Sequence, residues 1–325
     1  MTAKFFMTGW FNVRQELSKE RRKIIGWASF LLPILIWCTV SYVPFVWHPE
    51  VLVEKIGDVD YFQEGMRIDK AIYLEELANM KQQGKQAPQG EPANPIYLPA
   101  PHEVAKAFYN AFTTPPAQKD GLWMHESLWQ SIQVIFWGFV ISSIMGVPMG
   151  ILCGTYSLFA RLFEPFIEFF RYLPAPAFGA LMVAILGIYD GPKIAIIVIG
   201  TFFQQVLVIS NTTRKLDYSL IEAAMTLGTS KWKLLTNVVI PGILPSLYVD
   251  MRILLGWAWT YLIVAELIGT SSGITLYITQ QARYQHFENV YAAIFIIGFI
   301  GLGTDLILAW LGRRMFRWDK PANKE

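Results

Sequence analysis

The chain has 325 residues, of which 54% are apolar and only 16% are charged. This composition departs from that of an average soluble protein toward that of a membrane protein. The net charge of +2 gives no reason to expect nucleic acid as a partner. The two cysteines, Cys38 and Cys153, both fall in apolar segments, so the sequence predicts neither a disulfide framework nor a metal site.

The chain opens with a charged arm, residues 1–23, and then contains six mostly apolar runs of roughly 20 residues, the length that spans a bilayer. The predicted spans cover residues 24–43, 128–155, 166–188, 193–210, 243–268 and 290–312. The sequence therefore predicts an all-α polytopic membrane protein with six transmembrane helices, the last five forming a core over residues 128–312.

Lysine and arginine gather on one side of these spans. The amino-terminal arm, Arg161, the loop 211–241 and the tail 313–325 together hold sixteen of the 27 cationic residues. Because cationic loops stay in the cytoplasm, both termini are predicted to be cytoplasmic. The segment 44–127 then faces the opposite, periplasmic side.

Segment 44–127 is the one large piece between the predicted spans. Residues 61–83 have helical periodicity, whereas residues 84–95 have the Pro, Gly and Gln content of a flexible linker. Pro101 opens a further helix, which is expected to lie on the membrane surface.

The second span carries Gly146, Gly150 and Gly154 at four-residue spacing. This pattern lets the backbone of another helix approach closely. Pro148 in the same span, and Pro174 and Pro176 in the third span, predict bends.

The loop 211–241 contains a short and unusually apolar helix. Ser219 and Glu222 have capping-box spacing, and Gly228 is placed to end the helix. A second short helix is expected to follow and to stop at Pro241. Because the first helix lacks the aromatic and cationic faces of a membrane-surface helix, it is predicted to dock into a groove on a soluble partner.

A spaced pattern runs through this loop, comprising Glu222, Ala223, Ala224, Gly228, Val238, Ile240 and Pro241. It resembles the EAA loop of ATP-binding-cassette importer permeases, the element that docks on the ATPase subunit. Roughly two thirds of the chain, from "LPAPHEVAKAF" through "RRMFRW", is similar to the nitrate, sulfonate, taurine and bicarbonate branch of that family. Further matching pieces are "GVPMGILCG", "EPFIEFFRYLPAP" and "MRILLGWAWTYLIVAELIG".

The resemblance implies a permease subunit of the bacterial inner membrane that moves a small solute of the nitrate, sulfonate, taurine or bicarbonate type from periplasm to cytoplasm. The ATPase contact would be made by Glu222, Ala223, Ala224 and Gly228. The implied partners are the ATPase, a second permease copy and a periplasmic solute-binding protein. ATP and Mg²⁺ would bind to the ATPase, so the chain itself is not expected to be an enzyme.

The chain departs from these relatives in an insertion at about 48–96. This insertion either shapes the docking of the binding protein or forms a partly disordered spacer.

Ionisable residues inside a bilayer are costly, so each needs a partner or a water-lined cavity. Arg252 and Asp305 lie at similar predicted depth and are expected to form an ion pair, with Asp250 as the alternative partner of Arg252. Glu168 and Arg171 are expected to pair locally at headgroup level, unless Arg171 gates the solute path.

Other polar residues are candidates for the solute path. Thr201, Gln204 and Gln205 fall near the middle of the fourth span, where uncharged groups can hold an anion weakly, although bonding between helices is an equal alternative. Glu266 lies near the outer end of the fifth span. It is expected to be a hydrated helix terminus, or else a gate or a contact for the binding protein.

Two other classes of function stay open. An ion-coupled carrier or channel would use Arg252, Asp305 and Glu266 as a relay, but it gives no reason for the apolar cytoplasmic helix. A membrane enzyme is the second class. The four histidines are scattered and the chain has no Walker A sequence, so it has no such route to ATP hydrolysis.

Overall fold

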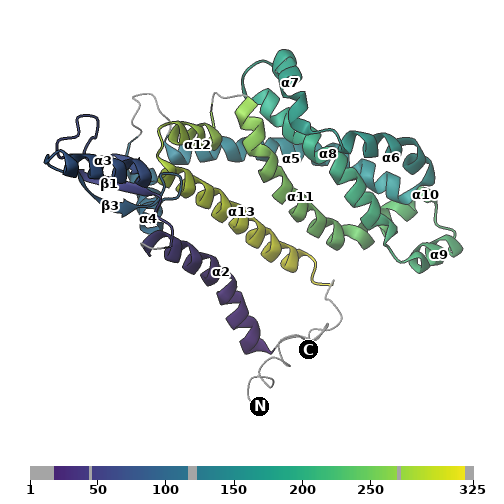
Figure 1. Ribbon diagram of the computed structural model, residues 1–325. Helices are drawn as coiled ribbons and strands as arrows, with labels where there is room; N and C mark the ends of the chain where they lie inside the picture. Colours follow the sequence, from purple (N-terminus) through teal and green to yellow (C-terminus); the bar gives the residue numbers. More distant parts are fainter. Residues whose placement is uncertain (1–17, 44–45, 116–122, 269–271, 319–325) are drawn as a thin grey trace. The chain divides into compact units, whose positions relative to one another are not determined.

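The computed structural model describes residues 18–43, 46–115, 123–268 and 272–318, and the chain divides into two compact units (Figure 1). The first unit comprises Met1–Ala107 with Gln285–Glu288, and the second comprises Phe108–Tyr284 with Asn289–Glu325. Most of the predicted amino-terminal arm, residues 1–17, and the end of the tail, residues 319–325, lie outside the described residues.

The first unit begins with α2 (Lys19–Tyr42), the first helix long and apolar enough to span a membrane. This helix begins before the predicted residue 24 because Ser18 caps it. The Ser18 hydroxyl accepts a hydrogen bond of 3.4 Å from the N–H of Arg21.

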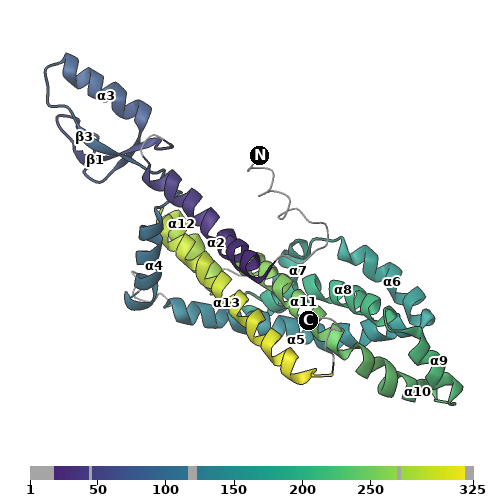
Figure 2. The ribbon, with the colours of Figure 1, turned by 90° about the horizontal axis from the view of Figure 1, so that it is seen from below.

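A small antiparallel sheet follows α2, with strand order β2-β1-β3. Its strands are β1 (Glu50–Lys55), β2 (Arg67–Asp69) and β3 (Gln89–Ala93), and helix α3 (Lys70–Gln82) lies beside them (Figure 2). The sheet forms because Val51 and Val53 alternate along β1 and are buried with Tyr73 of α3 in a separate apolar core. The flexible linker predicted for residues 84–95 is therefore wrong, since β3 occupies the centre of this segment, Gln89–Ala93, and pairs with β1.

The helix predicted over residues 61–83 is shorter than expected. Asp69 ends β2 and caps α3, because its carboxylate accepts a hydrogen bond of 2.8 Å from the N–H of Ala71. Val59 and Phe62 of the preceding loop fill the core of the sheet instead of forming a helical turn. Helix α4 (Pro101–Thr113) begins at Pro101, as predicted.

The second unit is a bundle of helices. Its four long helices are α5 (Met124–Thr155), α8 (Asp190–Arg214), α11 (Ile240–Ile268) and α13 (Phe287–Met315). Its shorter helical elements are α6 (Ser157–Arg171), η1 (Ala175–Phe178), α7 (Gly179–Leu186), α9 (Tyr218–Thr226), α10 (Lys231–Leu234), η2 (Leu235–Val239) and α12 (Ile274–Arg283). In Figure 1, α7 lies at one end of α8 and α9 lies at the other.

The close packing predicted for the glycines of the second span is confirmed. Gly146, Gly150 and Gly154 face α8, where a methyl group added at Gly150 would lie 2.8 Å from Cβ of Ile209. One at Gly154 would clash with the side chain of Thr213. These contacts follow the same order along both helices. Helices α5 and α8 therefore run parallel, with their backbones close together.

The third predicted span is broken rather than continuous. Helix α6 ends at Arg171, and the pair formed by residues 157–171 and 175–186 is bent by 86°. Pro174 lies in the break and Pro176 lies just after it. Each lacks the N–H that a continuous helix requires. The described chain has five helices that can span a membrane, or six if this bent pair is one crossing. The fold is that of an all-α polytopic membrane protein, and the small sheet is inserted in the sequence between the first two candidate spans, α2 and α5.

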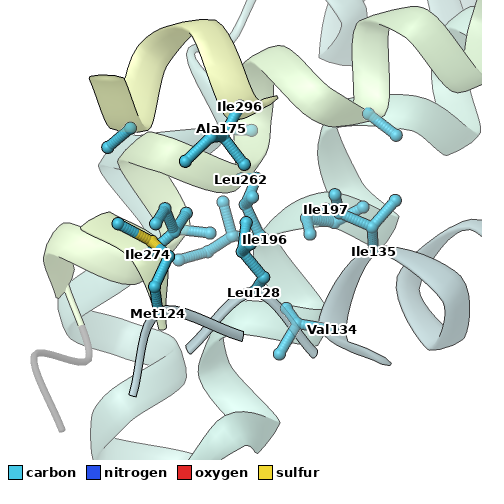
Figure 3. Close-up of a cluster of buried hydrophobic side chains, with 13 residues drawn as sticks. Met124, Leu128, Val134, Ile135, Ala175, Ile196, Ile197, Leu262, Ile274 and Ile296 are labelled. Carbon is cyan, nitrogen blue, oxygen red and sulfur yellow. The ribbon is translucent and has the colours of Figure 1, made fainter. Parts of the chain in front are cut away.

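The main core joins most of these helices. Figure 3 shows apolar side chains converging from α5, η1, α8, α11, α12 and α13, and the labelled ones are Met124, Leu128, Val134, Ile135, Ala175, Ile196, Ile197, Leu262, Ile274 and Ile296. Because α12 contributes Ile274 to this core, the segment between α11 and α13 is held against the bundle.

Candidate functional site

The short helix of the 211–241 loop is present as α9, but a different residue caps it. Asp217 is the N-cap, and its carboxylate accepts a hydrogen bond of 3.0 Å from the backbone N–H of Ser219. This bond also holds the pKa of Asp217 below its usual range. The capping box predicted for Ser219 and Glu222 is therefore wrong, and the helix begins earlier than expected.

Gly228 ends α9, as predicted. It has a φ of +74°, a conformation that favours glycine. The N–H of Gly228 donates to the Met225 carbonyl at 2.9 Å, and the N–H of Thr229 donates to the Ala224 carbonyl at 3.1 Å. This pair of bonds is a Schellman motif, so both ends of the nine-residue helix are fixed by local chemistry.

The apolar side chains of this segment do not all point the same way. Ala224 is buried within the chain, whereas Glu222, Ala223 and Gly228 are exposed. The exposed large apolar side chains of α9 and α10 are Tyr218, Leu220, Met225, Leu227 and Trp232. Leu227 is 86% exposed and Trp232 is 71% exposed, so the segment carries an apolar surface that the described chain leaves uncovered. We refer to these five side chains as the docking surface.

The second short helix does not stop at Pro241. Helix α10 passes into η2, a π-helical turn, and then into α11, so that one helical run of 38 residues extends from Lys231 to Ile268. In the π turn, the N–H of Ile240 donates to the carbonyl of Leu235. Because this turn changes the backbone bonding just before Pro241, the missing N–H of proline does not end the helix.

A polar cluster ties α8 to its neighbours just before α9. Glu164 of α6 accepts hydrogen bonds from Arg214 and, at 2.6 Å, from Ser210, both on α8. Arg214 also donates to the Cys153 carbonyl of α5 at 3.4 Å. The sequence analysis did not identify this cluster, although a search for a carboxylate partner of Arg214 near the same end of the bundle would have found Glu164.

The structure brings Arg252 and Asp305 together. The guanidinium of Arg252 donates from Nη2 to both carboxylate oxygens of Asp305, at 2.8 and 2.9 Å, and from Nε to Oδ1 at 3.1 Å. Asp250, the alternative partner, instead accepts a hydrogen bond from the hydroxyl of Thr212. The pair links α11 to α13 in a bidentate geometry.

Gln205 is bonded between helices. Its amide oxygen accepts from Ser142 at 2.9 Å, and its amide nitrogen donates to Ser143 at 3.2 Å, both on α5. Thr201 is also buried and donates to the Ile197 carbonyl of its own helix at 2.7 Å. In this conformation neither group is presented to a solute, while Gln204 is half-buried.

Arg171 and Glu168 are both exposed, and Arg171 is not paired with Glu168. Its guanidinium donates to the hydroxyl of Tyr172 at 3.0 Å and lies 4.9 Å from the centre of that ring. The expected local ion pair is therefore replaced by a contact with the neighbouring aromatic side chain, at the last residue of α6.

Glu266 is not the hydrated terminus that the sequence predicted. It is only 3% exposed, and its carboxylate accepts hydrogen bonds from the Ser131 hydroxyl at 2.5 Å and from the Thr275 N–H at 2.9 Å. Ser131 in turn accepts from the N–H of Ile274 at 2.9 Å. The carboxylate is therefore used to cap the positive end of α12, which explains its burial.

Lys193 is a second buried charge at this end of the bundle, and the sequence analysis missed it. Its ammonium donates to Asp190 at 3.0 Å and to the hydroxyl of Ser272 at 2.8 Å. The i, i+3 spacing of Asp190 and Lys193 was a detectable signal, but the bond to Ser272 spans 79 residues of sequence. The segment before α12 is thus held from both α8 and α11.

Comparisons with known proteins agree with this arrangement. Residues 146–317, just over half of the chain, match the family described as "Binding-protein-dependent transport system inner membrane component". The match covers the last part of α5, from Gly146 on, together with the docking surface and all of α13. It does not include the small sheet of the first unit.

Curated relatives are permease proteins. The chain is 32% identical over 195 residues to a probable ABC transporter permease of Brucella abortus, covering 60% of this chain and 78% of the relative. It is 31% identical over 227 residues to a putative aliphatic sulfonates transport permease of Escherichia coli, covering 68% and 82%. It is 29% identical over 225 residues to the taurine transport system permease of the same organism, covering 69% and 81%.

A solved structure shares the fold. The MetNI methionine ABC transporter, in an inward-facing conformation, has a chain that superposes with a TM-score of 0.53 at 18% identity, covering 62% of this chain and 98% of that one. The family match, the curated relatives and the helical architecture agree with one another. The chain therefore belongs to the family of binding-protein-dependent transport system inner membrane components, as a multi-pass permease component of the ABC importer class.

Proposed function

We propose that this chain is the permease subunit of an ATP-driven importer and that its docking surface binds a separate ATPase subunit. The observation that carries the proposal is the uncovered apolar surface on a short helix whose two ends are fixed by Asp217 and Gly228. A stable helix with exposed Leu227 and Trp232 fits the groove of a protein partner better than it fits water.

The docking residues in this proposal differ partly from those expected at first. Glu222, Ala223 and Gly228 are exposed and remain candidates for the ATPase contact, whereas Ala224 supports α9 from inside. Leu227 and Trp232 join the contact because large apolar side chains in the centre of an interface contribute most to binding.

The proposed assembly contains two copies of this permease, two ATPase subunits and a periplasmic solute-binding protein. The chain itself performs no hydrolysis; ATP and Mg²⁺ bind to the ATPase subunits. Both termini lie in the cytoplasm, on the same side as α9. ATP-driven movement of the ATPase subunits would then move α9 as a rigid body and shift the spans between inward-open and outward-open arrangements.

The proposed solute is a small anion of the nitrate, sulfonate, taurine or bicarbonate type. Support comes from relatives named for taurine, aliphatic sulfonates and bicarbonate. The path residues proposed from the sequence, Thr201, Gln204, Gln205, Arg171 and Glu266, are weaker candidates, because Gln205 and Glu266 are engaged within the protein in this conformation. A thermal-shift screen of the cognate binding protein against these solutes would identify the compound.

The docking surface is tested by co-purification with the ATPase subunit and by ATP-dependent uptake into proteoliposomes. Leu227→Asp and Trp232→Asp should each abolish co-purification and uptake while leaving the helical content of the chain unchanged. Tyr284→Asp, which alters an exposed aromatic residue at the end of α12, is the matched control and should co-purify normally. The proposal fails if both docking variants retain the ATPase, or if the chain alone transports solute without ATP, as a carrier or channel would.

A further inference from the structure

Helix α6 lies beside α8 in the bundle (Figure 1). Midway along α6, Glu164 accepts hydrogen bonds from Ser210 and Arg214, close to the last residue of α8. At the other end of α6, the ring of Phe170 stacks on that of Phe203, with 5.4 Å between the ring centres. Phe203 lies about 20 Å after the start of α8 and about 17 Å before its end. The end of α6 is therefore near the middle of a hydrocarbon core about 30 Å thick.

A charge stands at this depth, because the last residue of α6 is Arg171. Its side chain is exposed, and among the residues that the structure describes its guanidinium bonds to the Tyr172 hydroxyl and to no carboxylate. An arginine near a membrane surface can extend its charge into the headgroups, but this one is too far from either surface. A cation so placed needs an anionic partner or water.

The backbone is interrupted at the same depth. The segments 157–171 and 175–186 meet at 86°, and Tyr172 and Pro174 in the break are exposed. Non-helical backbone within a membrane is tolerated where it is buried in protein or lines a water-filled cavity. Discontinuous spanning helices of transporters also place polar groups near the bilayer midplane, where solutes bind. The unpaired charge and the exposed break both indicate water at this position.

Cover by another helix of this chain would not neutralise Arg171. Residues 24–42, which form most of α2, contain no charged side chain. Asp305 is already paired with Arg252. Glu168, one turn earlier on α6, is itself exposed and is not bonded to Arg171. An apolar surface packed over the guanidinium, from this or any other protein chain, would leave a buried and unpaired charge, which is costly.

We infer that Arg171, at the break in the third span, binds the transported anion within an aqueous solute path. This inference rests on the proposed function, because it takes the imported solute as the ligand. Of the path residues proposed from the sequence, Gln205 and Glu266 are engaged within the protein, whereas Arg171 keeps most of its N–H donors free in the described chain. A guanidinium donates two parallel hydrogen bonds to the oxyanion group that nitrate, bicarbonate and sulfonates share.

The Tyr172 side chain helps to present the guanidinium. Its hydroxyl accepts the bond from Arg171 at 3.0 Å, and its ring lies 4.9 Å from the guanidinium carbon. Because both side chains are exposed, the remaining donors of Arg171 stay accessible to a ligand. The ligand class that fits this site is a small oxyanion.

Thiol modification of the complete transporter in lipid nanodiscs tests this inference with a probe that is itself a sulfonate. In a background of Cys38→Ala and Cys153→Ala, Tyr172→Cys places a thiol beside Arg171. Sulfonatoethyl methanethiosulfonate should react with it at least about tenfold faster than the cationic trimethylammonioethyl reagent, because a cation in a cleft concentrates anions. Arg171→Gln should abolish this preference, and Arg171→Lys should retain most of it. Ethanesulfonate should slow the sulfonate reagent by competition.

Ile144→Cys in the same background is the matched control. Ile144 is exposed, lies two residues before Gly146, which packs against Gln205, and belongs to an uncharged stretch of α5 at about the same depth. It should react slowly with both reagents. The inference is overturned if the thiol at position 172 reacts as slowly as the one at position 144. It is also overturned if the two reagents react equally fast whether or not Arg171 is present.

Co-purification of the ATPase, measured on the same preparations through a tag on the permease, separates the two proposals. A complex that retains its ATPase but shows no preference for the anionic reagent refutes only the anion site. A preference that depends on Arg171, in a permease that never retains the ATPase, refutes only the proposed docking function.

Discussion

Glu266, near the carboxyl-terminal end of α11, caps α12 by accepting a hydrogen bond of 2.9 Å from the backbone N–H of Thr275. Gly273 immediately precedes α12 with a φ of +106°, and any side chain there would collide with the Glu266 carboxylate. The start of α12 is therefore built around this carboxylate, and glycine at 273 is required both by conformation and by space.

Replacing Glu266 should destabilise the packing of α12 against α5 and α11. Glu266→Ala leaves the Ser131 hydroxyl and the Thr275 N–H buried without their acceptor, at a cost of about 1–3 kcal/mol for each group. We expect a lower midpoint of thermal unfolding in detergent, with a smaller decrease for Glu266→Gln, which keeps an acceptor oxygen. Glu168→Ala, at an exposed position, is the control. An unfolding midpoint for Glu266→Ala equal to that of the control would contradict this role.

The packing of α5 against α8 predicts different effects for two glycines. Gly150→Ala places a methyl group 2.8 Å from Ile209 and 2.9 Å from the carbonyl of Val206, so the helices must separate at a cost of about 1–3 kcal/mol. Gly303→Ala meets no neighbouring atom and should be neutral or slightly stabilising, since alanine favours helix. Thermal unfolding of the two variants checks the difference. Equal midpoints would mean that α5 and α8 are not in close contact.

Amide hydrogen exchange can identify the residue that caps the start of α9. Asp217→Ala should increase exchange in the first turn of α9, because the N–H of Ser219 loses its acceptor. Asp217→Asn should have a smaller effect, since it retains an acceptor oxygen. Ser219→Ala serves as the comparison and should have a smaller effect than Asp217→Ala, because it removes the hydroxyl bond to Asp217 but keeps the backbone bond. If Ser219→Ala had the larger effect, the capping box formed by Ser219 and Glu222 would be the correct description.

The small sheet unit should show an unusual tyrosine titration. A hydrogen bond to the Glu76 carboxylate, followed by burial and by the nearby negative charge, raises the pKa of Tyr61 from 10.0 to about 12. Because the pKa is raised in the folded state, the interaction stabilises the fold fully below pH 10, and this stabilisation is lost as the pH rises toward 12. The difference in near-ultraviolet absorbance between the wild type and Tyr61→Phe follows this single group. Glu76→Gln should return the midpoint toward 10, and a wild-type midpoint already near 10 would exclude the bond.

Hydrophobic patterning was sufficient to predict the spans and the glycine-mediated contact, because both depend on side-chain type at regular spacing. The same holds for the end of α9, where Gly228 supplies the left-handed conformation. Sequence reasoning failed where contacts with residues far away in the sequence decide the local structure. The sheet was missed because β3 contains Gly90 and Pro92, which read as a linker until β1 pairs with them.

The candidate site shows the same division between local and distant effects. Arg252 and Asp305 were matched by depth alone, since a charge within the bilayer requires a partner. The burial of Glu266 was not foreseen, because it depends on the later helix α12 folding back over it. Pro241 was expected to stop a helix, and the π turn that precedes it could not be recognised from local sequence.

The helical run from Lys231 to Ile268 is continuous, so its two ends belong to one structural element. Trp232 is exposed near its first residue, and Glu266, near its last, caps the start of α12. At 1.5 Å per residue these two side chains are separated by about 50 Å along one helix. A displacement at Trp232 can therefore reach the start of α12 through continuous helical backbone rather than through a series of side-chain contacts.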